Sequence, residues 1–369
     1  MESSDISDAE GRPSAASGGS SRYRDWGIAL LSLVISLILA EILFRLAAGV
    51  PVFSFSNWRK ERVIANHLGD RAIVDPILGW KLKTDYRSDG FNTIAEGIRR
   101  NFDEADIRTG SILAVGDSFT EGWDEVRDEE SWPAQLEKLI GEAVVNGGIG
   151  GYASDQIVLR AEQLIPVVSP KTLIIGMNEI DIFRSAHAPF GAPKPYFTIA
   201  DGALQYHPPE PIENPQARNF AVTWLREALG YSAAMDFILG RLALDFWYGD
   251  TNQVYRRVHN DEVAVTCKLL HRLKAETDKR SIRTLLFMQY YGSFIVEEDE
   301  ISENAYNVEA CARDAGIEVI DQYAPLRQIA LADPRAIRSY YVMTGDEFGH
   351  MSPKGNAHAA ALVAEALKR

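Results

Sequence analysis

The sequence of 369 residues predicts an α/β protein in which a doubly wound, parallel sheet of about five strands forms an α/β/α sandwich, preceded by one transmembrane helix. Three observations predict this architecture. Short apolar runs recur along the chain, helical stretches separate them, and one long apolar segment lies near the N-terminus. Strands that are apolar throughout and alternate with helices are typical of a parallel sheet covered on both faces. Right-handed crossovers then make the sheet doubly wound.

The N-terminal fifty residues divide into a polar tail and an apolar segment. Residues 1–25 are rich in serine and glycine, which predicts a disordered tail. Residues 26–49 predict a transmembrane anchor. The uncharged run from Gly27 to Ala40 would span only about 21 Å as a helix, whereas continuation to Gly49 gives about 34 Å, enough for a hydrocarbon core of about 30 Å.

Two charges, Glu41 and Arg45, lie inside this segment. They are four residues apart with the acid first, so they can pair on one face of a helix, and Arg45 is near enough to the helix end to snorkel. A cleaved signal peptide is an alternative, but a charged helix end follows the apolar run and the tail precedes it. A buried amphipathic core helix is another, but the run is apolar on all sides. We therefore expect a single-pass anchor.

The charges that flank the anchor leave its orientation open. Positive residues are enriched on the cytoplasmic side of a membrane span. Here they are balanced, with Arg12, Arg22 and Arg24 before the segment and Arg59, Lys60 and Arg62 after it.

Composition excludes several classes of function. Lys and Arg number 38 against 52 Asp and Glu, and the formal net charge of −14 would repel a nucleic-acid backbone. The two cysteines, Cys267 and Cys311, are too few for a disulfide framework or a Cys-rich zinc site, and they do not reveal the redox compartment. The sequence also lacks a His-Glu-x-x-His pattern. We expect no metal, no cofactor and no nucleic-acid partner, and protein partners stay unknown.

The elements expected after the anchor belong to a connector and one domain. Residues 50–107 are a connector or small membrane-proximal region, and residues 108–369 form the domain, flavodoxin-like in its sheet, with an insertion at about 187–252. The insertion is rich in proline and aromatic residues, which could line a sugar- or acyl-binding groove; we expect core packing of a helix over about 219–246 to account for most of the aromatics instead. The expected strands are 111–115, 143–145, 172–175, 284–288 and 318–320. The expected helices are 131–140, 154–164, 262–277, 303–315 and 357–368.

The ends of the first three strands carry polar or glycine-rich motifs. Gly116-Asp117-Ser118 follows the first strand, 146–152 (Asn-Gly-Gly-Ile-Gly-Gly-Tyr) follows the second, and Gly176-Met177-Asn178-Glu179 follows the third. Sites in doubly wound sheets lie at the carboxyl ends of the strands. A serine at such a turn, leading into a helix, suits a nucleophile. Each motif alone could be a helix cap or a tight turn, but three at successive strand ends favour a site.

A histidine near the C-terminus can supply the base. His350 precedes the last expected helix, and an imidazole can take a serine proton when a carboxylate holds its other nitrogen. Glu347 and Asp346 lie in the same loop and could do this. The alternative is a surface loop whose histidine and acids are solvated.

Together these residues resemble the four sequence blocks of the SGNH, or GDSL-type, hydrolases. The resemblance covers about residues 108–369 and implies that Ser118 is the nucleophile and His350 the base. It also implies an oxyanion hole made by the N–H of Ser118, the N–H of Gly151 and the side chain of Asn178. The family places an orienting acid three residues before the histidine, where this chain has Glu347 instead of Asp, with Asp346 one residue earlier; which of the two orients His350 stays open.

The chain looks most similar to membrane-anchored bacterial members of that family, which also carry a Leu-Gly-Trp stretch, here Leu78-Gly79-Trp80. This resemblance implies an extracytoplasmic catalytic domain. It also implies a serine-dependent ester hydrolase or O-acyl transferase that acts on an acylated carbohydrate or lipid by two-step acyl transfer. The substrate would be a small-molecule, glycan or lipid ester. The alternative is a non-catalytic SGNH-like binding or assembly module at the membrane, motivated by the altered acid before His350.

Overall fold

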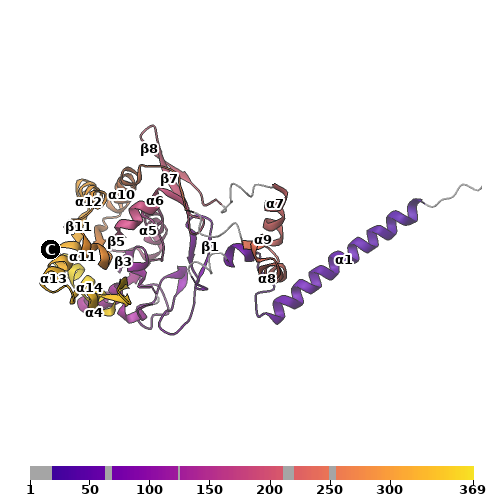
Figure 1. Ribbon diagram of the computed structural model, residues 1–369, viewed down its shortest axis with the longest axis horizontal. Helices are drawn as coiled ribbons and strands as arrows, with labels where there is room; N and C mark the ends of the chain where they lie inside the picture. The colour runs from indigo at the N-terminus through magenta and orange to yellow at the C-terminus, as the bar shows by residue number, and fades with distance from the viewer. Residues whose placement is uncertain (1–18, 63–68, 124, 211–219, 249–254) are drawn as a thin grey trace, which may run out of the picture.

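The computed structural model describes residues 19–62, 69–123, 125–210, 220–248 and 255–369 (Figure 1). Its centre is a five-stranded parallel sheet with the strand order β11-β10-β5-β3-β4. The α/β class and the doubly wound sheet predicted from the sequence are therefore confirmed. The strands are β3 (Ile112–Val115), β4 (Val144–Asn146), β5 (Thr172–Asn178), β10 (Arg283–Gln289) and β11 (Glu318–Asp321).

Helices cover both faces of this sheet. On one face, α4 packs against α14, and the indole of Trp132 meets the ring of Phe287 on β10 edge-on at 5.6 Å. On the other face, α5, α10 and α12 pack together. The helix bounds are α4 (Trp132–Ile140), α5 (Ser154–Val168), α10 (Glu262–Lys279), α12 (Glu303–Asp314), α13 (Tyr323–Ala332) and α14 (Pro353–Leu367). With helices on both sides, the strands bury apolar side chains on both faces, which is why they appear in the sequence as unbroken apolar runs.

The N-terminal helix α1 (Gly19–Ala47) projects away from the sheet domain (Figure 1). Its stretch Tyr23–Ala47 is long and apolar enough to cross a membrane, and its most apolar 18-residue window is not buried against the rest of the chain. The helix begins within the segment expected to be a disordered tail, whose first eighteen residues lie outside the described part of the chain. Glu41 and Arg45 pair on the helix at 2.6 Å.

The segment between α1 and the sheet domain packs partly on that domain. Its strands β1 (Ala72–Asp75) and β2 (Gly79–Leu82) form an antiparallel hairpin. Trp80 is fully buried and donates its indole N–H to the carbonyl of Gly150, at 3.1 Å. The hydroxyl of Tyr152 donates in return to the carbonyl of Trp80, at 2.7 Å. The hairpin thus supports the loop that follows β4.

The insertion between β5 and β10 contains small strand pairs and three short helices. A buried ion pair, Lys194 with Asp155 at 2.8 Å, fixes it to α5. The single helix expected over 219–246 is instead three helices in the described part, separated near Gly230 and at Ala243. The elements are β6 (His187–Phe190), β7 (Tyr196–Ala200), β8 (Ala203–His207), α7 (Phe220–Leu229), α8 (Ala233–Leu242), α9 (Leu244–Tyr248) and β9 (Tyr255–Arg257).

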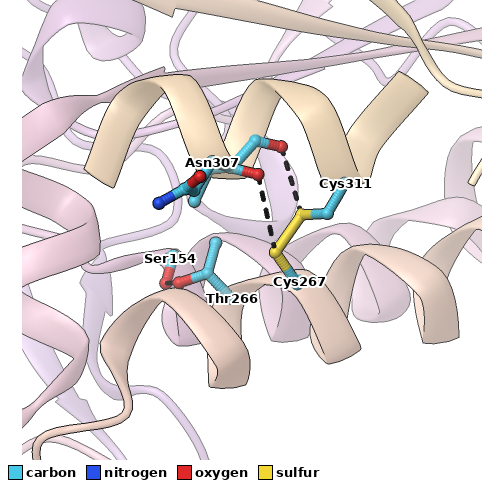
Figure 2. The surroundings of a disulfide bond; sticks show 6 residues. Ser154, Thr266, Cys267, Asn307 and Cys311 are labelled. Carbon is cyan, nitrogen blue, oxygen red and sulfur yellow. Dashed lines mark hydrogen bonds between the residues drawn. A yellow bond between two sulfur atoms is a disulfide. The ribbon is translucent and has the colours of Figure 1, made fainter. Parts of the chain in front are cut away.

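The two cysteines form one disulfide, which joins α10 to α12 (Figure 2). Cys267 and Cys311 are 44 residues apart in sequence, so the bridge closes a long loop that includes β10. Beside it, the hydroxyls of Ser154 and Thr266 hydrogen-bond at 2.7 Å and join α5 to α10. All three helices on this face of the sheet are therefore cross-connected.

The disulfide should stabilise the sheet domain measurably. We expect the double substitution Cys267→Ser and Cys311→Ser to lower the free energy of unfolding by about 2–4 kcal/mol, because the unfolded chain regains the freedom of the long loop. Thermal unfolding of the full chain in detergent measures this. A reducing agent should lower the midpoint of the wild type and leave that of the double variant unchanged; equal midpoints for the two proteins under oxidising conditions would contradict the expectation.

Candidate active site

The three motif-bearing strand ends meet at one edge of the sheet. β3 lies between β4 and β5, so the segments that follow these strands are neighbours. Backbone hydrogen bonds join the first two: Gly147 N–H donates to the carbonyl of Ala114 at 2.8 Å, and Ile149 N–H donates to that of Gly116 at 3.0 Å. The strand order reverses at this point, which is where doubly wound sheets place their sites.

The turn after β3 requires glycine and is fixed by a cap. A Cβ on Gly116 would lie 2.1 Å from Oγ1 of Thr120 and 2.7 Å from the carbonyl oxygen of Gly176, so no side chain fits. Asp117 caps the short helix α3 (Ser118–Glu121), with its carboxylate accepting from the N–H of Phe119 at 2.9 Å. The capping alternative considered for this motif thus describes Asp117. It leaves Ser118, the first residue of the helix, free for another contact.

His350 provides that contact from the opposite end of the domain. It lies on β13 (Glu347–Met351), which forms an antiparallel hairpin with β12 (Tyr341–Thr344). Its Nε2 is 2.9 Å from Oγ of Ser118. The serine is nearly fully buried and the imidazole is half-buried, so this hydrogen bond is shielded from most of the solvent.

The carboxylate beside His350 is neither of the two expected. In the described part of the chain, Nδ1 of His350 lies 3.3 Å from Oε1 of Glu125. Asp346 is fully exposed and pairs with Arg338. Glu347 is exposed, and among the described residues no hydrogen bond or ion pair joins it to His350. In this structure Glu125, from another part of the chain, thus occupies the place expected for Glu347 or Asp346, because those two acids lie in an exposed hairpin instead of a loop folded over the imidazole.

Glu125 had no distinguishing sign in the sequence. It follows α3 in a stretch crowded with acids, and nothing in the spacing separates it from its neighbours. Trp123, two residues earlier, has a left-handed backbone with φ of 46°. A bulky residue rarely adopts that conformation, so the sequence pattern does not indicate it.

Aromatic rings surround the imidazole and restrict its orientation. Trp123 stacks on His350 with a centroid distance of 5.4 Å and an interplanar angle of 17°. Phe119 lies at 5.4 Å on another side. The guanidinium of Arg71 lies 4.5 Å over the Trp123 ring and 3.5 Å from the carboxylate of Glu121. The stack therefore connects the membrane-proximal segment to the histidine.

The remaining predicted site residues lie in the neighbouring loops. Asn178, at the end of β5, accepts from the N–H of Ile180 through Oδ1, and its buried Nδ2 has no hydrogen-bond partner among the described residues. Gly151 lies in the loop after β4 with φ of 76°, a conformation that favours glycine. A buried amide without a partner is costly, so Nδ2 of Asn178 is a donor available to a bound group.

A second group of charges lies beneath the serine. Arg184 lies 2.9 Å from Asp181 and 3.6 Å from Asp117. Burial, together with the charge of Asp117, raises the pKa of Asp181 well above its ordinary value. Burial also raises the pKa of Tyr291 to about 12. Arg184 therefore contacts two buried carboxyl groups, one of which belongs to Asp117, the residue before Ser118.

A serine, an imidazole and a carboxylate in successive hydrogen-bond contact, with a free amide donor nearby, can carry out nucleophilic acyl transfer. A sequence model of the GDSL-like lipase/acylhydrolase family matches residues 114–358, well over half of the chain. The chain belongs to this family and is an ester-bond hydrolase. The comparison with curated proteins finds no match.

Solved structures of esterases are among those similar to this chain. The acetyl xylan esterase AlAXEase is 12% identical, with 69% of this chain and 98% of that chain covered and a TM-score of 0.40. The lipase/acylhydrolase from Enterococcus faecalis is 15% identical, with 70% and 95% covered and a TM-score of 0.39. A catalytic mutant of Axe2, an acetylxylan esterase from Geobacillus stearothermophilus, is 15% identical, with 70% and 94% covered and a TM-score of 0.39.

The stacked indole depends on a glycine in the loop after β4. A Cβ on Gly150 would lie 2.1 Å from the Trp123 ring. We expect Gly150→Ala to displace the ring and with it His350, and to lower kcat/KM for an aryl ester by about 10²-fold, as misplacement of reacting groups on the order of 1 Å does.

A double-mutant cycle tests this cause. In a Trp123→Ala background the added methyl meets no ring, so Gly150→Ala should then have little further effect on kcat/KM. An equal loss in both backgrounds would show that the effect does not pass through the indole.

Proposed function

We propose that this protein is a membrane-anchored, serine-dependent ester hydrolase or O-acyl transferase that acts on an acylated carbohydrate or lipid. One observation carries the proposal: His350 lies between Ser118 and Glu125, in hydrogen-bond contact with both. The non-catalytic alternative was motivated by the altered acid before His350, and a carboxylate beside the imidazole, that of Glu125, weakens that motive.

The proposed reaction has two steps. His350 Nε2 takes the proton of Ser118 Oγ as that oxygen attacks the ester carbonyl, while Glu125 holds Nδ1–H and stabilises the imidazolium. The oxyanion accepts hydrogen bonds from the N–H groups of Ser118 and Gly151 and from Nδ2 of Asn178. The tetrahedral intermediate then collapses: the bond between the carbonyl carbon and the alcohol oxygen breaks, and His350 donates its proton to the departing alcohol. Water, or the hydroxyl of an acceptor sugar, then attacks the acyl-serine by the same route in reverse.

The surroundings of the site support an acylated carbohydrate or lipid as the substrate. Trp123, Phe119 and Tyr291 place aromatic rings within 6.4 Å of the His350 ring centroid. Aromatic faces pack equally against the apolar face of a sugar ring and against an acyl chain. A membrane-anchored enzyme would meet either substrate close to the bilayer.

Two features support a retained anchor with the domain outside the cytoplasm. Arg45 of α1 donates to the carbonyl of Tyr231, and Glu41 accepts from Ser232 and Ala233, so the helix is bonded to the folded insertion. A signal peptide destined for removal has no need of such contacts. The Cys267–Cys311 disulfide is characteristic of an oxidising compartment and so supports an extracytoplasmic domain.

Substitution of the serine and of the amide donor should separate their roles. We expect Ser118→Ala to abolish both hydrolysis of a short aryl ester and labelling by a fluorophosphonate probe. Asn178→Ala keeps the nucleophile but loses an oxyanion donor, so the protein should still be labelled while kcat falls by about 10²–10³-fold. Wild-type protein that neither hydrolyses esters nor reacts with the probe, yet binds acetylated glycans, would support the non-catalytic alternative instead.

The assignment of the orienting acid has two matched controls. We expect Glu125→Gln to lower kcat by about 10²-fold, because the imidazolium formed in the transition state loses its carboxylate. Glu347→Gln and Asp346→Asn remove the same charge from acids on the neighbouring hairpin that do not contact His350, and both should retain wild-type kcat. A loss confined to either hairpin variant would transfer the role to that acid.

A further inference from the structure

Exposed apolar side chains gather where α1 meets the insertion. Figure 1 shows α7, α8 and α9 beside the C-terminal end of α1, between that helix and the sheet domain. Their exposed residues, with those of the segment after α1, include Phe53, Phe55, Trp224, Phe237, Ile238 and Leu242. We call these six residues the collar. The side chains of Phe53 and Leu242 are 90% and 82% exposed, which is costly in water for groups of this size.

In α8, apolar side chains are exposed and a charged side chain is buried, which is the reverse of a helix on a water-exposed surface. Phe237, Ile238, Arg241 and Leu242 lie on its exposed side, with the Arg241 guanidinium 3.6 Å over the Phe237 ring. Its buried side carries Asp236, which accepts from the indole N–H of Trp247, at 2.8 Å. An apolar face rimmed by arginine is the pattern of a helix that lies in a membrane interface.

Hydrogen bonds hold α8 at a defined level along α1. Glu41 accepts from the hydroxyl of Ser232 at 2.6 Å and from the N–H groups of Ala233 and Ala234 at 2.8 and 3.2 Å, so its carboxylate caps the start of α8. The ring of Phe44 packs on that of Phe237 with a centroid distance of 5.2 Å. Glu41, a charged residue inside the apolar segment, thus binds the insertion to α1.

That level coincides with the expected surface of the bilayer. Trp26, near the start of α1, is exposed, as expected of an aromatic at one membrane interface. Arg45 lies nineteen residues further along, or about 28 Å along the helix axis, close to the thickness of a hydrocarbon core of about 30 Å. Arg45 donates to the carbonyl of Tyr231, directly before α8. The end of α8 that binds α1 therefore lies at the second interface.

We propose that the collar is a membrane-interfacial surface that inserts its side chains into the headgroup region of the same bilayer that α1 crosses. The occupant is lipid because the collar adjoins the lipid-facing surface of α1 and lies at the level of its boundary. The inference rests on the membrane anchor of the proposed function and extends it: the protein is seated on the membrane as well as tethered to it. The proposed ester-cleaving site is thereby held at a fixed distance from the bilayer surface.

Site-specific labelling tests this proposal in the full chain. Single substitutions Leu33→Cys in the anchor, Leu242→Cys in the collar and Leu331→Cys on α13 are labelled with an environment-sensitive fluorophore and reconstituted in phosphatidylcholine vesicles. All three leucines are exposed, at 56%, 82% and 67%. We expect blue-shifted emission at positions 33 and 242, quenched when the lipid chains are brominated close to the headgroup. Position 331 should show the emission of a label in water in both kinds of vesicle.

Each other result overturns the proposal in a recognisable way. If position 33 is quenched and position 242 behaves like 331, the chain is anchored but the collar does not meet lipid. A label at 242 whose emission is blue-shifted but not quenched by bromine is shielded by protein. If that blue shift also depends on the ratio of protein to lipid, a second copy of the chain covers the collar. If the label at position 33 is not quenched, α1 does not cross the bilayer, and the proposal that the collar meets lipid is wrong as well. Hydrolysis of a soluble aryl ester by the same labelled proteins reports separately on the catalytic part of the proposed function.

Discussion

The hydrogen bond between Ser118 and His350 joins residues 232 positions apart, and it requires both ends of the domain to be folded together. α14, which follows the histidine, packs against α4, which follows the serine, on one face of the sheet. Between them, the side-chain oxygen of Asn356 accepts from Trp132 N–H at 2.9 Å, and its amide donates to the carbonyl of Met351 at 3.0 Å. The distance between Ser118 and His350 thus depends on a helix pair and one buried amide.

Most of the fold could be predicted because the sheet is covered on both sides. Every strand of the central sheet is an apolar run that differs from prediction by at most a few residues, as for Thr172–Asn178. The single helix expected in the insertion could not be corrected from pattern, because Gly230 and Ala243 end helices there through local backbone geometry that hydrophobic spacing does not encode. The pairing of Cys267 with Cys311 likewise depends on two helices meeting across a face.

The residues of the candidate site likewise divide into those that the sequence indicates and those that only the structure reveals. That Ser118, Gly151 and Asn178 lie in neighbouring loops could be predicted, because topology brings the ends of neighbouring parallel strands to one edge. The acid could not be predicted, since Glu125 lies 225 residues before His350 in the sequence and no motif distinguishes it from the acids around it. Similarly, Glu41 and Arg45 could be recognised as a pair within α1, but their second set of partners on the insertion is visible only in three dimensions.

The hairpin β12–β13 carries the histidine but neither of its partners. Ser118 and Glu125 both belong to the segment that follows β3, so the two contacts of the imidazole are made across the same boundary. If the hairpin lifted by a few ångströms, both hydrogen bonds and the stacking on Trp123 would be lost in one movement. The contacts of His350 with Ser118, Glu125 and Trp123 therefore all depend on the position of this one hairpin.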